Sequence, residues 1–358
     1  MLNRFFKLTL VSSFVALTSL TACKKETDSS NDVKEAKVLE ATKIHGKTMG
    51  TFYAVNVVGG FEGGEEALTE LCEGIFKEIC DRISTFDKNA ELARFNDFKS
   101  TEPFEISNEL GILIQDCVYQ SRRIEGAMDI SVGPLVNLWG FGKDRRLERA
   151  PTQADIDERK KLVGLDKFEL RTTKDKSYLV KHHADVRLDM ATVGEGIGAD
   201  MVAEALVKRG YRNFMVNVAG ASRSLGLNEK GRKWRIGIED PTSMAPKVLV
   251  PVCPLNDAVT TAGSYRNFFK DENTGRVYSH AIDPKTGYPV SHSTLSVTVI
   301  SHSAFESDAL DTGLLVLGAD RALKFGEDNN MAIATIEYVD GKVQFRHTKA
   351  FERYLECK

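Results

Sequence analysis

The runs FMVNV (214–218), WRIGI (234–238), VLVPV (248–252) and AVTT (258–261) crowd together in the second half of the chain. A fifth run, LSVTVIS (295–301), precedes a segment with helical spacing over about 304–317. Short apolar runs and apolar residues at alternate positions are typical of β-strands. This part of the sequence therefore predicts several short strands and one long helix.

Outward from these runs, the part of the chain that precedes them predicts one strand and three helices. Residues 49–58 alternate as a strand does, whereas apolar residues recur with helical spacing over 68–83 and 108–124. A third helix is predicted to follow Gly196 and to stop at Gly210, a suitable residue for a helix end. Helices mixed with runs of short strands favour an α+β fold with mixed or antiparallel sheets over regular βαβ alternation.

Composition sets the broad class of protein. The 358 residues include 48 basic and 51 acidic side chains, and the net charge of −3 offers no basic footprint for nucleic acid. Hydrophobic residues make up 42% of the chain, which is enough for a buried core. Because no Pro- or Ser-rich linker divides residues 38–358, we expect them to form one catalytic unit.

The N-terminus predicts export and a lipid anchor. Two basic residues precede an apolar run over 8–20 that is shorter than the roughly 20 residues a membrane helix needs, so residues 1–22 read as a signal peptide. The stretch from Leu20 to Cys23 is similar to the bacterial lipoprotein box, which makes Cys23 the lipidated residue. The alternative is an ordinary signal peptide with a chance cysteine.

The residues after Cys23 are expected to form a flexible tether over 23–37, since they are rich in charged and small polar side chains. The residue directly after Cys23 is Lys24, and not the Asp that at this position resembles an inner-membrane retention signal. We therefore expect a membrane-anchored protein that faces the periplasm, with the outer membrane favoured over the inner one.

The other five cysteines are interpreted as buried free thiols that act as small hydrophobic residues. An odd number leaves at least one of them unpaired within the chain. Cys72 and Cys80 lie about 12 Å apart along a predicted helix, too far for a disulfide. No spacing suggests a zinc site. The remaining members of the group are Cys117, Cys253 and Cys357.

Dense blocks of glycine and polar residues recur along the chain, as expected of loops that converge on one ligand. No GxSxG, P-loop or HExxH motif is present, and Gly194 to Gly198 only superficially resembles a dinucleotide loop. The blocks are Met49-Gly50-Thr51, Ser84-Thr85-Phe86, Arg94-Phe95-Asn96, 126–129, 129–142, 189–196, 234–238, 263–267, His280-x-x-Asp283-Pro284-x-Thr286-Gly287 and 308–312.

In this combination and order, the blocks resemble the ApbE family of FAD:protein FMN transferases from about Met49 to Leu317. The resemblance implies an ApbE-like fold and a periplasmic enzyme that cleaves FAD, releases AMP and leaves FMN as a phosphoester on a Ser or Thr of a flavoprotein. It implies acceptor subunits of membrane redox complexes, of the Na⁺-pumping NADH:quinone reductase or Rnf type, modified at a Thr in a Ser/Thr-Gly-Ala-Thr-like segment.

Two positions depart from the family pattern. Glu195 stands where one large branch of the family has a Lys. At this position the chain resembles the branch that is typical of Gram-negative lipoproteins. Ala219 precedes Gly220 where the family usually has two glycines, so an extra methyl group could crowd a close backbone approach to the flavin.

The resemblance also implies a Mg²⁺ site. Asp308 and Thr312 are i and i+4 on one predicted helix, so their oxygens share a face, and in the family they join an oxygen at the position of Thr192. Mg²⁺ prefers hard oxygen ligands and typically keeps few protein contacts beside substrate phosphates. A solvated helix face is the alternative for the Asp/Thr pair.

Flavin-binding residues follow from the same resemblance, with FAD as the donor substrate. Some of these residues would offer apolar faces to the flavin ring system, and the carboxylates would accept hydrogen bonds from the ring, the ribose or the adenine. The residues are Met49, Phe86, Ala127, Met128, Asp129, Asp189, Glu195 and Ile282. His280 could assist proton transfer because a histidine titrates near working pH. The alternative is that it braces the turn at Asp283. Two rival functions remain, an FAD pyrophosphatase that yields FMN and AMP, and a flavin-binding lipoprotein without catalysis.

Overall fold

The computed structural model describes residues 38–142, 149–243, 245–265 and 267–357. The predicted signal peptide, Cys23 and the tether lie outside the described residues. These described residues form one compact unit. Among the described residues, no helix has the length and apolarity needed to cross a membrane.

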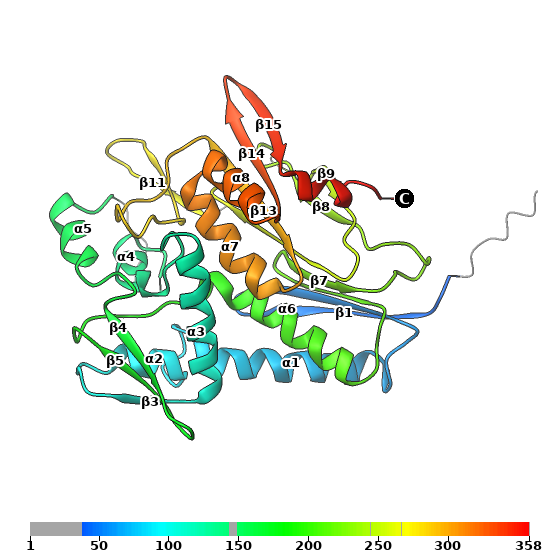
Figure 1. Cartoon of the computed structure of the whole chain (residues 1–358), viewed down its shortest axis with the longest axis horizontal. Helices are drawn as coiled ribbons and strands as arrows, with labels where there is room; N and C mark the ends of the chain where they lie inside the picture. The colour runs from blue at the N-terminus through cyan, green and yellow to red at the C-terminus, as the bar shows by residue number, and fades with distance from the viewer. Residues whose placement is uncertain (1–37, 143–148, 244, 266, 358) are drawn as a thin grey trace, which may run out of the picture. The chain divides into compact units, whose positions relative to one another are not determined.

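An eight-stranded antiparallel sheet forms the centre of this unit (Figure 1). Its strand order is β1-β2-β6-β7-β10-β13-β14-β15, so the N-terminal hairpin pairs with a strand from the middle of the chain. The strands are β1 (Ala41–Thr48), β2 (Thr51–Val58), β6 (Phe214–Val218), β7 (Ala221–Leu225), β10 (Ala258–Gly263), β13 (Thr294–Ser301), β14 (Ala332–Val339) and β15 (Lys342–His347).

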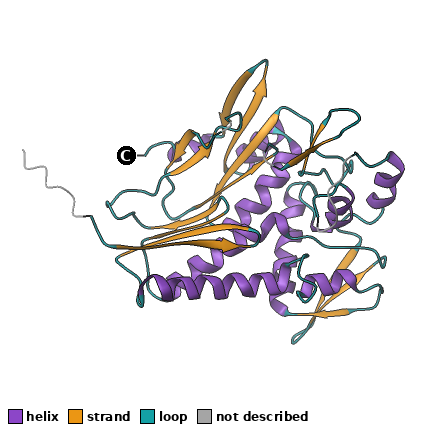
Figure 2. Ribbon diagram, turned by 180° about the vertical axis from the view of Figure 1, so that it is seen from behind, coloured by secondary structure: helices purple, strands orange, loops and turns teal. Residues whose placement is uncertain are grey.

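Helices cover one face of this sheet (Figure 2). The helix α1 (Gly64–Ile83) packs on β1, α6 (Ala191–Lys208) on β6 and β7, and α7 (Ala304–Leu317) on β10 and β13. Behind them, α3 (Asn108–Arg123) packs against α7, while α8 (Ala319–Asp328) packs against β14. The shorter helices are α2 (Glu91–Asp97), α4 (Gly133–Leu138), α5 (Gln153–Lys160), η1 (Ile130–Val132) and η2 (Lys349–Tyr354).

Strand alternation explains how the sheet uses both faces. Val297 and Val299 of β13 point into the core beneath the helices, whereas Ile300 points to a second buried cluster on the other face. That second cluster is covered by η2 and by the two-stranded sheet of β8 (Ile236–Glu239) and β9 (Val248–Val252). Two further small sheets are β3 (Phe104–Ile106)-β5 (Ser177–Lys181)-β4 (Phe168–Thr172) and β11 (Phe268–Lys270)-β12 (Val277–Ser279).

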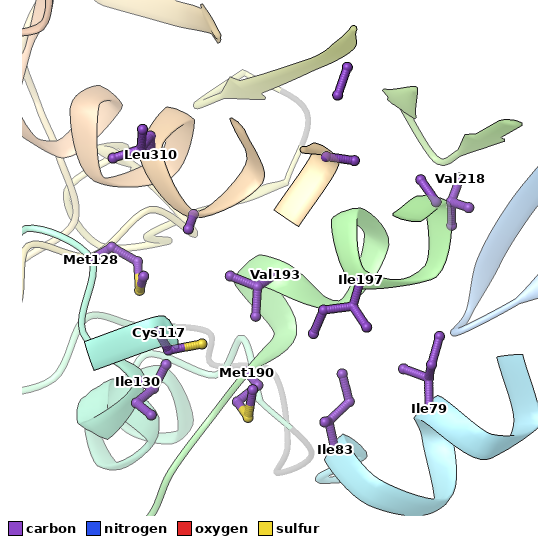
Figure 3. Close-up of a cluster of buried hydrophobic side chains, with 14 of the residues drawn as sticks. Ile79, Ile83, Cys117, Met128, Ile130, Met190, Val193, Ile197, Val218 and Leu310 are labelled. Carbon is purple, nitrogen blue, oxygen red and sulfur yellow. The ribbon is translucent and has the colours of Figure 1, made fainter. Parts of the chain in front are cut away.

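The core between α1 and α6 is built from side chains at helical spacing. Ile79 and Ile83 of α1 lie opposite Val193 and Ile197 of α6 (Figure 3). Gly196 faces the other way, toward α7, where a Cβ atom would lie 2.5 Å from the carbonyl oxygen of Ala304. The absence of a side chain there is what lets α6 and α7 pack in close contact.

The predicted α+β class is confirmed, and every predicted strand and helix exists with small shifts of its ends. The clearest difference is α6, which begins at Ala191 rather than after Gly196. The first turn of this helix therefore carries residues that the sequence placed in a loop. The strands β1, β3, β4, β5, β7, β11, β12, β14 and β15 were not predicted.

The interpretation of all five remaining cysteines as free thiols is wrong for two of them. Cys253 and Cys357 form a disulfide, with Cα atoms 5.2 Å apart. They meet because η2 returns the chain to the end of β9, where the Cys253 N–H donates to the Tyr354 carbonyl over 2.8 Å. Cys72, Cys80 and Cys117 are free.

Candidate functional site

A cavity of about 560 Å³ brings together segments from much of the chain. This volume is in the range of protein sites for small organic ligands. Its wall includes eleven of the twelve predicted flavin, metal and catalytic residues: Phe86, Ala127, Met128, Asp129, Asp189, Thr192, Glu195, His280, Ile282, Asp308 and Thr312.

Met49 is the predicted flavin residue that the cavity wall does not include. It occupies the turn between β1 and β2 with a positive φ of 49°, and its side chain packs against α6 beside Gly194 and Gly198. In this structure Met49 therefore supports the first turns of α6 from behind.

The acidic end of the cavity lies on α7. Asp308 and Thr312 share one face of this helix, as predicted, and the neighbouring Asp311 also lines the cavity. Asp308 accepts a hydrogen bond from the Gly196 N–H over 2.8 Å, and Asp311 accepts one from the Thr312 hydroxyl over 3.2 Å. Asp311 was not predicted, although its i+3 spacing from Asp308 places it on the same side of a helix.

The carboxyl groups at this end are strongly perturbed. Burial, together with repulsion between Asp308 and Asp311, raises the pKa of both groups well above the usual range. Burial also raises the pKa of Glu195, to about 7. No lysine or arginine in the described part of the chain forms an ion pair with any of these three carboxyl groups.

A divalent cation fits this group of oxygens, provided that a ligand supplies some of its contacts. In the described ranges, no three His, Cys, Asp or Glu side chains converge as a metal site. Mg²⁺ often binds through one or two carboxylates and substrate phosphates. The carboxylates of Asp308 and Asp311 with the hydroxyls of Thr312 and Thr192 form a donor set of that kind.

A second pair of carboxyls, Asp129 and Asp189, is fixed by local backbone hydrogen bonds. Asp129 precedes η1 and accepts from the backbone N–H and the hydroxyl of Ser131 over 2.8 and 2.6 Å. Asp189 accepts from the Ala191 N–H over 2.9 Å at the start of α6. Burial raises the pKa of both groups. Both residues line the cavity, and each carboxyl group has further lone pairs with which it can accept from a ligand.

The segment before Asp189 is held by Asn96, which belongs to the Arg-Phe-Asn block and does not line the cavity. Its side-chain amide donates to the Leu188 carbonyl over 2.8 Å and accepts from the Leu188 N–H over 2.7 Å. The buried ammonium of Lys181 donates to the carbonyls of Asn96 and Phe98 over 3.1 and 2.8 Å. This block therefore acts on the cavity by positioning Asp189.

The apolar part of the wall reaches the rim at Phe86, whose side chain is 70% exposed. The Ser84 hydroxyl accepts from the N–H groups of Phe86 and Asp87 over 3.2 and 3.1 Å, which fixes this loop. Ala219 also lines the wall, with a positive φ of 52° and its N–H donating to the Phe52 carbonyl over 2.9 Å. The methyl group expected from the sequence thus lies at the cavity surface, in a conformation that favours glycine.

His280 follows β12 and faces the cavity. Its Nδ1 lies 3.1 Å from the Asn267 carbonyl oxygen, which also accepts from the His280 backbone N–H over 3.0 Å. The atoms that crowd the ring lower its pKa by desolvation, although the residue keeps an exposed edge. A neutral imidazole that donates from Nδ1 carries its lone pair on Nε2, where it can accept a proton.

Comparison with known proteins gives one consistent family. Residues 49–336 match the sequence model of the ApbE family. A protein of Haemophilus influenzae named FAD:protein FMN transferase is 38% identical over 356 residues, which cover 98% of this chain and 99% of the relative. A protein of the same name from Escherichia coli is 37% identical over 297 residues, covering 83% and 84% of the two chains.

Solved structures give the same result. The flavin transferase ApbE from Vibrio cholerae superposes with a TM-score of 0.79 at 33% identity, covering 88% of this chain and 100% of that one. The apo form of the flavinyl transferase ApbE from Pseudomonas stutzeri has a TM-score of 0.79 at 31% identity, covering 88% and 97%.

Proposed function

This chain belongs to the ApbE family and is a flavin transferase, and we propose that it moves the FMN half of FAD onto a Ser or Thr hydroxyl with the help of Mg²⁺. The observation that carries the proposal is that one cavity holds both an apolar, carboxylate-lined wall and the buried acids of α7. The first suits a flavin, and the second suits a cation beside its pyrophosphate.

In the proposed reaction, the acceptor hydroxyl oxygen forms a bond to the FMN phosphorus while the bond to the AMP oxygen breaks. The hydroxyl proton goes to Nε2 of His280, and AMP leaves with the electron pair of the broken bond. A Mg²⁺ ion held there would supply positive charge against the phosphates, and such reactions depend mostly on positioning and electrostatics. Asp308, Asp311, Thr312 and Thr192 would hold the cation.

The flavin itself would be held by the opposite part of the wall. Phe86, Met128 and Ile282 offer apolar surface to the ring system, with Ala127 beside them. The carboxyl groups accept hydrogen bonds from ring, ribose or adenine donors, a role assigned to Asp129, Asp189 and Glu195. Met49 would contribute through α6, since it packs behind the wall.

We also propose that the enzyme works outside the cytoplasm, anchored by a lipid on Cys23 and facing the periplasm, with the outer membrane favoured. The disulfide between Cys253 and Cys357 supports this location because such bonds persist in oxidising compartments. Acceptors there would be flavoprotein subunits of membrane redox complexes, of the Na⁺-pumping NADH:quinone reductase or Rnf type.

A second candidate reaction is hydrolysis of FAD to FMN and AMP, with water in place of the acceptor hydroxyl. The exposed rim at Phe86 supports this second candidate, since solvent reaches the same cavity. A flavin carrier without catalysis is less well supported, because storage of flavin does not require buried acids beside the phosphates.

The decisive experiment combines the protein, FAD, Mg²⁺ and an acceptor carrying a Ser/Thr-Gly-Ala-Thr segment, followed by intact mass. A gain of one FMN by the acceptor, lost in EDTA and lost when the target Thr is replaced by Ala, is the expected result. Rapid release of AMP and FMN that is independent of the acceptor would establish the hydrolase instead. Binding of FAD without cleavage would leave the carrier.

A further inference from the structure

One wall of the cavity is the edge of a β-strand. All four residues of β8, Ile236 to Glu239, line the cavity. Successive side chains of a strand point to opposite faces, so four consecutive residues can line one cavity only along the strand edge. The main chain of β8 therefore faces the cavity. None of the flavin or metal residues assigned above comes from this strand.

The pairing of β8 with β9 shows which main-chain groups face away from β9. Gly237 lies opposite Pro251, while Ile236 and Ile238 lie opposite Val252 and Val250. Proline has no N–H, so Gly237 and Pro251 cannot exchange the two hydrogen bonds of a bonded antiparallel pair. The bonded pairs are consequently those of Ile236 and Ile238, and the N–H and carbonyl of Gly237 point to the opposite edge.

That edge has no strand beside it within the described residues. There, β8 pairs with β9 alone, and neither the N–H nor the carbonyl of Gly237 bonds to another described residue. Gly237 is exposed. Unpaired strand edges bind extended peptides by adding a strand, with main-chain hydrogen bonds giving affinity.

We propose that the edge of β8 receives the acceptor segment as an added strand and so delivers its hydroxyl to the cavity. The inference rests on the proposed function, which requires a protein main chain to approach the acids of α7. An extended segment fits this need because its side chains alternate, so one hydroxyl can enter the cavity while its neighbours face outward. Flavin is the less suitable occupant, since the adjacent N–H and carbonyl of Gly237 match the main-chain groups of one peptide residue.

The test uses a synthetic peptide of about twelve residues centred on Ser-Gly-Ala-Thr, with the whole enzyme, FAD and Mg²⁺. Single backbone amides of the peptide are N-methylated in turn, and FMN transfer is measured by intact mass. Amides that pair with β8 should alternate with amides that face away. We expect at least a tenfold loss of transfer at alternate positions, with the interleaved positions close to the unmodified peptide and serving as matched controls.

The second measurement is amide hydrogen exchange of the enzyme at single residues, with a peptide whose target Thr is replaced by Ala. Protection of the Gly237 amide by this peptide is expected. The amides of β15, a free edge of the main sheet outside the cavity wall, are the control and should not change. A side-chain change at Gly237 is a poorer test, because a Cβ atom there would lie 2.5 Å from the Val248 side chain.

The two proposals fail in different ways. FMN transfer to the peptide with no alternation and no protection of Gly237 would overturn the β8 inference while the transferase function stands. Protection of Gly237 by FAD and Mg²⁺ alone would also overturn it, by assigning the edge to the flavin. Absence of transfer to any acceptor would contradict the proposed function, whereas peptide protection of Gly237 would still support the docking edge.

Discussion

The Gly196 N–H of α6 donates to the Asp308 carboxylate of α7 over 2.8 Å. A reciprocal contact lies one turn further along α6, where the Asp200 carboxylate accepts from the N–H groups of Ala304 and Phe305, both over 2.9 Å. Each helix thus supplies one carboxylate that is held by backbone N–H groups of the other. The orientation of Asp308 in the cavity therefore depends on how closely α6 and α7 pack.

Gly196→Ala should separate the two helices and misplace Asp308. A Cβ atom there would lie 2.5 Å from the Ala304 carbonyl oxygen and 2.8 Å from the Asp308 Cβ. Overpacking of this kind costs about 1–3 kcal/mol. We expect a lower midpoint in urea unfolding and a loss of FMN transfer that excess FAD does not restore.

Gly194→Ala is the matched control on the same helix, because its added Cβ would meet only side chains at 3.4 and 3.6 Å, which is ordinary contact. It should fold and react nearly as the wild type does. Equal losses in the two variants would show that glycine content, and not the contact with α7, is responsible.

Asp308→Asn should remove the Mg²⁺ dependence of FMN transfer together with most of the activity. The amide keeps the shape of the carboxylate and can still accept from Gly196, so the fold should be preserved. We expect the rate to fall by at least about 100-fold, the scale of losing one charge-stabilising group. Thr312→Val should have a smaller effect, because a neutral hydroxyl is a weaker ligand. A rate in Asp308→Asn equal to the wild type at every Mg²⁺ concentration would refute the assignment.

The lowered pKa of His280 leads to a prediction about the pH dependence of FMN transfer. Desolvation lowers its pKa, so the ring is neutral at pH 7 and becomes protonated only when the pH falls below the usual histidine range. The acid limb of kcat/KM should therefore lie below the usual value near 6.5. His280→Asn can still donate to the Asn267 carbonyl but cannot act as a base. Retention of the acid limb and full rate in this variant would favour the bracing role.

The lowered pKa of Lys181 leads to the prediction that its contribution to the free energy of unfolding rises with pH. Burial lowers its pKa from 10.5 to about 8, so between these values the unfolded chain binds more protons than the folded one. Its contribution to the free energy of unfolding should therefore increase across that window. The difference between wild type and Lys181→Met should grow by roughly 1–3 kcal/mol from pH 7 to pH 10. Lys99→Met, which removes an exposed ammonium, should show no comparable change.

The disulfide leads to a prediction about how a reductant changes the stability of the protein. Loss of the bond between Cys253 and Cys357, which closes a sequence separation of 104 residues, should cost about 2–5 kcal/mol. Dithiothreitol should lower the unfolding midpoint of the wild type but not that of a Cys253→Ser/Cys357→Ser variant. Cys80→Ser removes a free thiol and should leave the response to reductant unchanged. Insensitivity of the wild type would contradict the bond.

The elements that could be predicted from sequence are those with strong local patterns. The runs of β6, β9 and β13 and the amphipathic spacing of α1 and α3 are visible without any partner. Short strands such as β3 and β5 exist because of their pairing, which a single segment does not reveal. The start of α6 was missed because glycines at 194, 196 and 198 lower helix propensity, and packing against α7 overrides that preference.

The motif blocks predicted which residues line the cavity, but they did not predict how these residues contact one another. Asp311 has the spacing to join Asp308, yet only burial shows that the two share an environment. Asn96 belongs to a block that looks like part of the site, but its hydrogen bonds place it behind Asp189. The free edge of β8 depends on the direction in which the Gly237 N–H and carbonyl point. In the sequence, the sign of that direction is Pro251 in the facing strand, which has no N–H.

The pairing of β2 with β6 also affects the order of folding. It joins residues as far apart in sequence as Tyr53 and Val218, and the cavity wall runs from Phe86 to Thr312. Contacts between distant residues require loop closure and form slowly. The cavity is therefore completed only when most of the chain has folded. A partly folded molecule therefore has no assembled cavity in which FAD could bind.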